Sequence, residues 1–159
     1  MESRRYNYGL TLIEMLVVVA TIALLATIIV AAVSRIDNQS KERGLQNLFA
    51  LLESALQEYH EYTAKFPDQP EKNFANAAAH VEYMYGQLYS VPCSRTVLQK
   101  VGGSLLKNKT GAADKPEIYD PWGTVLDYTY APGDSFPLLV SAGKDKAFGT
   151  ADDITSKGM

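Results

Sequence analysis

A single carboxylate interrupts a long apolar stretch near the start of the chain. Glu14 lies a few residues into this stretch, and no further charged residue follows before Arg35. A carboxylate inside an apolar membrane span costs roughly 2.5 kcal/mol or more, so an acid kept there is a functional candidate. It needs a cation as its partner, and no Lys or Arg lies within one helical turn of it in the sequence.

Carboxylates also gather near the C-terminus, in the segment Ala142–Ile154. Asp145, Asp152 and Asp153 lie there within nine residues, separated by turn-forming residues. Unless a cation neutralises them, carboxylates held this close repel one another. Ca²⁺ takes about 6–8 oxygen ligands, and a loop can bend around it, although the spacing is not that of an EF-hand. From the spacing alone two interpretations stay open, a metal-binding loop and a solvated acidic turn.

No arrangement typical of a catalytic site is visible in the sequence. His60 and His80 stand apart without the Cys/His spacing of a zinc site, and no Ser-His-Asp pattern or nucleophile elbow occurs. Cys93 is the only cysteine, so we expect a buried small apolar side chain there and no intramolecular disulfide. The net charge of −3 gives no support to a nucleic acid partner. We therefore expect a protein that is not an enzyme.

The segment that holds Glu14 is long enough to cross a membrane. From Met15 to Val33 there is no charged residue, proline or glycine. At ~1.5 Å per residue this run comes close to the ~30 Å thickness of the bilayer hydrocarbon. Arg4 and Arg5 precede it, as in a secretory signal peptide or a signal anchor. The apolar core exceeds the usual length of about 7–15 residues and lacks a cleavage site of small residues, which favours an anchor with its N-terminus in the cytoplasm.

Beyond Val33 the chain becomes polar, and its apolar residues recur with the 3.6-residue period of a helix that has one buried face. This face comprises Leu45, Leu48, Phe49, Leu52, Leu56 and Tyr59. We predict one helix from about Thr11 to Ala64, with its first half in lipid or in a filament core and its second half packed on a globular domain. Two helices with a break near Ser34–Asn38 are the alternative.

Short helices and a hairpin are predicted for the rest of the chain. The prolines within 66–70 should end the long helix. Helices are expected at 75–89, with a stripe formed by Ala78, Val81, Tyr85 and Leu88, and at 94–101, with Ser94 as N-cap. Strands are expected at 125–130 and 136–141, joined by a turn. The predicted fold class is α+β, a long N-terminal helix packed on a small antiparallel sheet, with a helical insert of unassigned role at about 74–115.

The N-terminal residues resemble the class III signal of the type IV pilin and pseudopilin superfamily. The resemblance rests on a basic leader that ends in glycine, the sequence Thr-Leu-Ile-Glu at 11–14, and the apolar run that follows. It implies that a prepilin peptidase cleaves between Gly9 and Leu10 and that Leu10 is then N-methylated. It also implies that Glu14 serves assembly, by pairing with the N-terminal ammonium group, commonly that of a neighbouring subunit.

The C-terminal third is similar to the major pseudopilins of type II secretion. The similarity lies in an Asp-Pro-Trp-Gly motif at 120–123, a tyrosine-rich strand, a Pro-Gly turn, and Gly-Thr-Ala-Asp-Asp-Ile at 149–154. In that family the C-terminal loop wraps a calcium ion. By position, the resemblance implies carboxylate ligands from Asp145, Asp152 and Asp153. It further implies backbone carbonyl ligands from Ala142 and from a residue near Thr150.

The resemblance implies a pilin-like protein with a leader at 1–9, a transmembrane or filament-core helix at 10–34, and a periplasmic domain at 35–159 that carries a calcium loop at 142–154. Such a protein is a structural subunit of a type II secretion pseudopilus, single-pass in the inner membrane, which polymerises into a periplasmic filament that drives export across the outer membrane. Its implied partners are further copies of the chain, minor pseudopilins, the prepilin peptidase and the inner-membrane secretion platform.

Two alternatives stay open for the function. A type IV pilin or a minor pseudopilin would belong to the same structural class. A membrane-anchored periplasmic enzyme or binding module would belong to a different one, and it is disfavoured because no catalytic constellation or ligand motif stands out in the sequence.

Overall fold

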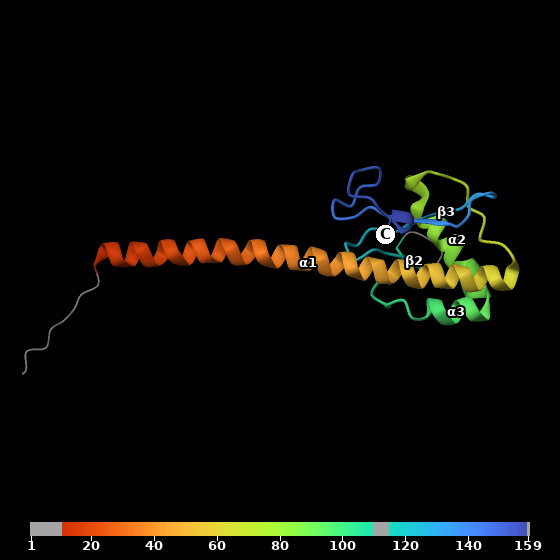
Figure 1. The fold of residues 1–159 in the computed structure, drawn as a ribbon, viewed down its shortest axis with the longest axis horizontal. Coiled ribbons are helices and arrows are strands. Elements are labelled where there is room, and N and C mark those ends of the chain that lie inside the picture. Colours follow the sequence, from red (N-terminus) through yellow and green to blue (C-terminus); the bar gives the residue numbers. More distant parts are fainter. Residues whose placement is uncertain (1–10, 110–114, 159) are drawn as a thin grey trace, which may run out of the picture. The chain divides into compact units, whose positions relative to one another are not determined.

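A computed structural model gives the fold of residues 11–109 and 115–158, without describing the side chains of residues 30–35. The protein is α+β, and its described part combines a long N-terminal helix, shorter helices and two small antiparallel sheets (Figure 1). The chain divides into two compact units, Met1–Gln39 and Ser40–Met159. The predicted leader and the residues on either side of its cleavage point, Gly9 and Leu10, lie outside the described residues.

The N-terminal helix α1 spans Leu12–Thr63 without interruption over 52 residues. The prediction of one helix is confirmed, and the alternative with a break near Ser34–Asn38 is wrong. The helix ends before the prolines, because Ala64 adopts a left-handed conformation with φ of 58°. Its backbone N–H still donates to the His60 carbonyl oxygen at 2.8 Å, which closes the last turn.

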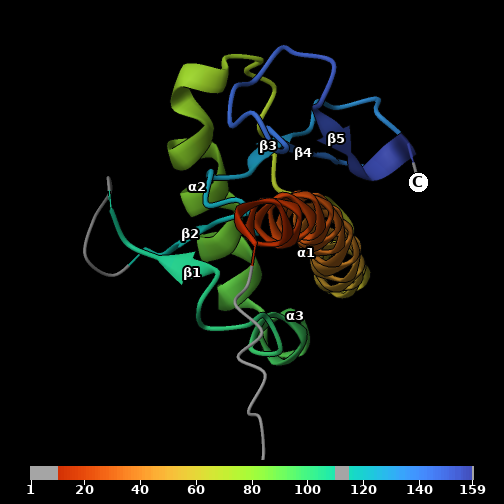
Figure 2. The ribbon, with the colours of Figure 1, turned by 90° about the vertical axis from the view of Figure 1, so that its left-hand side faces the viewer.

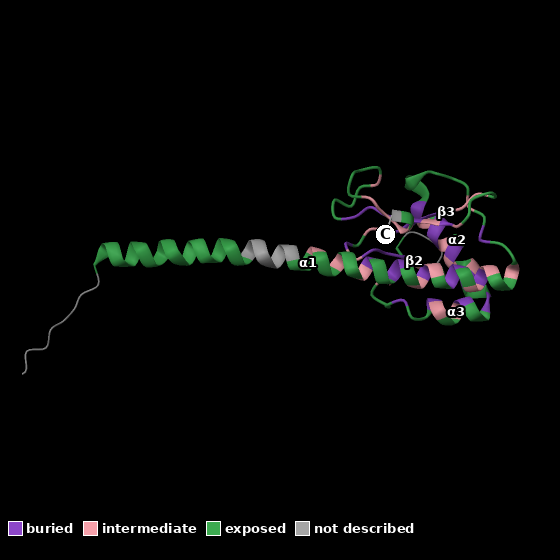
Figure 3. Ribbon diagram, viewed as in Figure 1, coloured by how far each residue is buried: buried purple, intermediate pink, exposed green. Residues whose placement is uncertain are grey.

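In the first unit, the window Leu12–Ile29 of α1 has a mean hydropathy of 2.7 and no buried residues. By length and composition this segment could cross a membrane. Figure 3 shows the same stretch as exposed along its described length. A chain on its own therefore leaves this apolar surface uncovered, and either lipid or other protein chains must cover it in water.

In the second unit, the apolar face predicted for α1 forms one side of the core. All of its members from Leu45 to Tyr59 are buried, and they cluster with Leu126, Tyr128 and Leu139 from the C-terminal third. Figure 3 shows this buried face as a stripe along the helix. Tyr128 is fully buried, and its hydroxyl donates to the Pro67 carbonyl oxygen at 2.7 Å. The prediction that this half of the helix packs on a sheet is therefore confirmed.

The insert contains a short 3-10 helix η1 at Phe74–Asn76, the helix α2 at Ala77–Ser90 and the helix α3 at Pro92–Leu98. Helices were predicted in both places, but the N-cap of α3 is Val91 and not Ser94. Ser94 lies inside α3, where its hydroxyl donates to the Ala55 carbonyl oxygen of α1 at 2.8 Å. With Ser94 directed at α1, its neighbour Cys93 is exposed, so the prediction of a buried cysteine is wrong.

The predicted hairpin supplies two strands of a three-stranded sheet, in which β4 at Leu138–Ser141 lies between β3 at Asp127–Thr129 and β5 at Ile154–Thr155. Tyr128 pairs with Leu139 in an antiparallel register, and both strands are shorter than predicted. The sequence analysis missed β5, and also a second sheet of β1 at Leu106–Lys107 and β2 at Glu117–Ile118. Figures 1 and 2 show the three-stranded sheet and α3 on opposite sides of the C-terminal half of α1.

Candidate functional site

The carboxylate of Glu14 closes the first turn of α1 by a reciprocal pair of hydrogen bonds with Thr11. The backbone N–H and the hydroxyl of Thr11 both donate to Glu14 Oε2 at 2.7 Å. In return, the Glu14 N–H donates to the Thr11 hydroxyl oxygen at 3.3 Å. This arrangement is a capping box, which satisfies N–H groups that a helix end otherwise leaves unpaired. A Thr-x-x-Glu spacing before an apolar run signals such a box, so this contact could have been predicted from the sequence.

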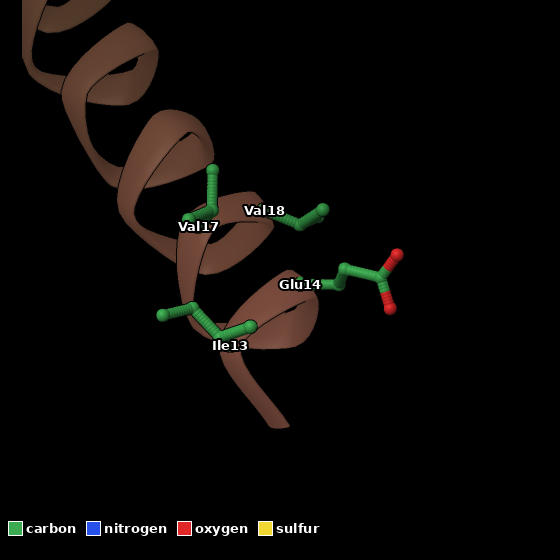
Figure 4. A pocket seen from close by; sticks show the side chains of 4 residues that line it. All are labelled: Ile13, Glu14, Val17 and Val18. Carbon is green, nitrogen blue, oxygen red and sulfur yellow. The ribbon is translucent and has the colours of Figure 1, made fainter. Parts of the chain in front are cut away.

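The surroundings of Glu14 are otherwise apolar. Ile13, Val17 and Val18 line a shallow hollow beside it, and Figure 4 shows its carboxylate directed away from the helix on the side of Val18. It is the only charged residue of the window Leu12–Ile29. Among the residues that the structure describes, no cation lies against this carboxylate. The expected ammonium partner would belong to Leu10, which lies outside the described residues.

The second candidate, the segment Ala142–Ile154, is called the acidic loop below. Its two ends are joined by the antiparallel pairing of β4 and β5, in which Ser141 lies opposite Ile154. Gly143, with φ of 66°, lies so close to the Asp152 carbonyl group that a Cβ atom there would overlap it. Glycine is therefore required at 143 for both its conformation and its size. The acidic loop is thus closed at its base.

Backbone N–H groups hold the three predicted carboxylates of the acidic loop. Asp152 Oδ2 accepts from Asp145 N–H at 3.0 Å, and Asp145 Oδ1 accepts from Ala147 N–H at 2.9 Å. Asp153 Oδ2 accepts from Gly149 N–H at 2.7 Å. Each N–H donor places a partial positive charge beside a carboxylate, which offsets the repulsion between the carboxylates. Each of the three carboxylates thus accepts a hydrogen bond from a backbone N–H group of the acidic loop.

The acidic loop contains the carboxylate and carbonyl oxygens predicted to bind a cation, but its carboxylates are not arranged around one point. Within residues 11–109 and 115–158, no group of three or more His, Cys, Asp or Glu side chains is placed to hold a metal ion. However, Asp153 Oδ1 is buried and has no hydrogen-bond partner there. The predicted carbonyl ligands lie at the base and tip of the loop: Ala142 is fully buried, and the Thr150 carbonyl oxygen faces Asp153 N–H at 3.4 Å. An orphaned carboxylate oxygen fits a hard cation such as Ca²⁺.

The buried carboxylate of Asp120, in the Asp-Pro-Trp-Gly motif, supports the base of the acidic loop. Asp120 Oδ1 accepts from the N–H groups of Trp122 at 3.0 Å and Thr124 at 2.8 Å. Asp120 Oδ2 accepts from the Ser141 hydroxyl at 2.7 Å, and that hydroxyl oxygen accepts from Gly143 N–H at 3.1 Å. The Asp-Pro-Trp-Gly turn is therefore joined to the first residues of the acidic loop.

A second buried polar cluster joins α2 to the sheet. His80 Nδ1 lies 2.7 Å from Asp127 Oδ1 of β3, and His80 Nε2 lies 3.4 Å from Glu71 Oε2. Burial raises the pKa of the Asp127 carboxyl, and hydrogen bonds from His80 and Thr129 lower it in part. The pKa of the exposed Glu71 is lowered by hydrogen bonds from Asn76 and then from His80. The spacing of these residues in the sequence gave no sign of this cluster, because the fold alone brings them together.

Comparison with models of known protein families, with curated proteins and with solved structures found no match to this chain.

Proposed function

We propose that this protein is a pilin-like structural subunit, anchored in a membrane by α1 and polymerised through the same helix into a filament. The observation that carries the proposal is the exposed apolar window Leu12–Ile29 with one carboxylate near its start. A span of this length and hydropathy fits a bilayer, and the same apolar surface fits the core of a filament once several copies pack together.

The position of Glu14 supports assembly as the use of this helix. An anchor alone gains only the capping box from a carboxylate in its apolar first turn, where the group costs roughly 2.5 kcal/mol or more in lipid. The resemblance to pilins and pseudopilins supplies a cation, the N-terminal ammonium of a Leu10 released by cleavage after Gly9. A neighbouring copy offers that ammonium only when subunits pack side by side, so the pairing links assembly to this one residue.

The acidic loop supports a closer assignment to the major pseudopilins of type II secretion, with one Ca²⁺ bound by the loop. Asp145, Asp152 and Asp153 would hold the ion together with the carbonyl groups of Ala142 and Thr150. The ion supplies positive charge that neutralises carboxylates which otherwise repel one another. The buried oxygen Asp153 Oδ1, which lacks a hydrogen-bond partner in the described part of the chain, is the observation that favours this ligand set.

The proposal extends to topology and partners. The N-terminus would lie in the cytoplasm and residues 35–159 in the periplasm of a cell with two membranes. The filament would be a homopolymer that also contains minor pseudopilins, is processed by a prepilin peptidase and grows from an inner-membrane secretion platform. A type IV pilin or a minor pseudopilin is the second candidate, favoured if the acidic loop binds no Ca²⁺, because α1 and Glu14 serve all members of this class equally.

The experiment that tests the proposal compares wild type with Glu14→Leu in cells that contain the assembly machinery. Glu14→Leu should enter the membrane fraction at least as well as wild type, because the change removes a charge from lipid. It should nevertheless fail to give the cross-linked multimers that wild type gives. Multimers at wild-type level in this variant would contradict the proposed role of Glu14.

A further inference from the structure

We propose that the helical insert braces the acidic loop through a stacked pair of phenylalanines, which makes Phe74 a positioning residue for the carboxylates of that loop. The ring centroids of Phe74 and Phe148 lie 4.7 Å apart, and the ring planes are inclined by 8°. Phe74 begins η1, and Phe148 lies at the middle of the acidic loop. Figures 1 and 2 both show the C-terminal loop beside the N-terminal end of the insert.

Phe148 lies between two residues whose backbone N–H groups donate to carboxylates of the acidic loop. The preceding residue, Ala147, donates its N–H to Asp145, and the following residue, Gly149, donates its N–H to Asp153. A displacement of the Phe148 ring therefore displaces both donors, because each is one peptide away. Whatever fixes Phe148 thus also fixes the separation of Asp145 from Asp153.

Phe74, in turn, is held by a chain of contacts that leads into the buried sheet. The Asn73 side chain accepts from Ala75 N–H at 3.1 Å and caps η1. The Asn76 side chain donates to Glu71 Oε1 at 2.7 Å, which ties η1 to the Glu71 carboxylate. His80 then links that carboxylate to Asp127 of β3. Asp127 is buried, with 1% of its surface exposed. The Phe74 side of the stack is therefore anchored.

The acidic loop has few other side-chain anchors between its ends. Its residues 144–147 and 149–152 are exposed, whereas Phe148 is half-buried. A parallel, offset pair of aromatic rings at this separation changes an equilibrium by about two- to tenfold. We infer that loss of the Phe74 ring shifts the acidic loop toward open conformations by that factor. This part of the inference concerns the loop itself, and only its consequence for Ca²⁺ affinity rests on the proposed function.

The test uses the full chain in detergent micelles and measures amide hydrogen exchange at Ala147 and Gly149 in the presence of EGTA. Phe74→Ala should raise exchange at both amides by about two- to tenfold, and Phe74→Tyr, which keeps the ring, should restore the wild-type rate. Tyr83→Ala is the matched control, because Tyr83 is an aromatic residue of the same insert, 44% exposed. Phe74→Leu keeps apolar bulk without the ring and replaces Phe74→Ala if that variant fails to fold.

Calorimetric titration of the same proteins with CaCl₂ supplies the second readout. Phe74→Ala should weaken Ca²⁺ affinity by about two- to tenfold, while Tyr83→Ala and Phe74→Tyr should match wild type. Exchange rates in Phe74→Ala and Phe74→Leu that equal those of wild type would overturn the brace, whether or not Ca²⁺ binds. If wild type binds no Ca²⁺, the proposed calcium site is wrong. Faster exchange at Ala147 and Gly149 in Phe74→Ala would still support the brace.

Discussion

At the scale of single residues, Glu14 has one observed role and one proposed role, and substitutions can separate them. Its carboxylate completes a capping box with Thr11, and its charge is the feature that resembles the assembly acid of pilins and pseudopilins. A cap needs an oxygen that accepts from an N–H group, which a neutral amide also offers, whereas an ammonium partner needs the charge. Substitutions at the two ends of the box therefore give different results under the two roles.

The first prediction distinguishes the capping role of Glu14 from its proposed role in assembly. Glu14→Gln should keep the cap and lose assembly, because only the charge is removed. Thr11→Ala should cost about 1 kcal/mol at the helix end and still assemble, because the charge is kept. Cross-linked multimers recovered from membranes measure assembly in both variants. Equal assembly by Glu14→Gln and wild type would show that Glu14 serves only as a cap.

The buried pair of His80 and Asp127 gives a second prediction at this scale. His80→Leu should lower the free energy of unfolding by about 1–3 kcal/mol, because it leaves the buried Asp127 carboxyl group without its hydrogen bond to His80. The double substitution with Asp127→Leu should recover much of that loss, since it removes the buried carboxyl group that has lost its hydrogen bond. Glu71→Gln, at the exposed end of the cluster, should cost less than about 1 kcal/mol. Denaturant unfolding of the four proteins checks this, and a small effect of His80→Leu would contradict it.

At the scale of elements, periodicity predicted the features that one segment determines by itself. The apolar face of α1 from Leu45 to Tyr59 and the hairpin of β3 and β4 follow from spacings of 3.6 and 2 residues. Segments too short to show a period, such as β5 with Ile154 and Thr155, form only because the end of the acidic loop returns to β4. The sequence likewise places Asp145, Asp152 and Asp153 in one loop, because they are close along the chain, but it does not predict how their carboxylates are oriented.

Contacts between elements that are far apart in the chain could not be predicted from the sequence. Asp120 meets Ser141, at the end of β4, across 21 positions, and His80 meets Asp127 across 47. Cys93 shows the same limit, because a lone cysteine is buried or exposed according to the phase of its helix. That phase is set here by the start of α3 at Pro92 and by the contact of Ser94 with α1.

The acidic loop carries the prediction that belongs to this scale. Binding of one Ca²⁺ at a hundredfold excess over Kd stabilises a protein by about 2.7 kcal/mol. The full chain in detergent should therefore melt several degrees higher in CaCl₂ than in EGTA, with Mg²⁺ a poor substitute. Asp152→Ala and Asp153→Ala should abolish the shift, and Asp68→Ala, an exposed aspartate outside the loop, should keep it. Equal melting of wild type in CaCl₂ and EGTA would leave the loop a solvated acidic turn.

At the scale of the whole molecule, the two units differ in whether they bury their own apolar side chains. The unit Ser40–Met159 buries its own core, whereas the described part of Met1–Gln39 exposes its large apolar side chains from Leu12 to Ile29. In the proposed function, a membrane covers that surface before assembly, and other copies of the same helix cover it in a filament. A subunit that moves between these two environments needs a signal that releases its N-terminus for pairing, and cleavage after Gly9 is that signal in our account.

Intact mass spectrometry of the protein extracted from membranes tests this account most directly. In cells with an active prepilin peptidase we predict one species that lacks residues 1–9 and carries one methyl group on Leu10. Replacement of Gly9 by a bulky residue should leave the leader in place and serves as the control. A wild-type protein that keeps Met1–Gly9 in those cells, while a known pilin-like substrate is processed, would contradict the account.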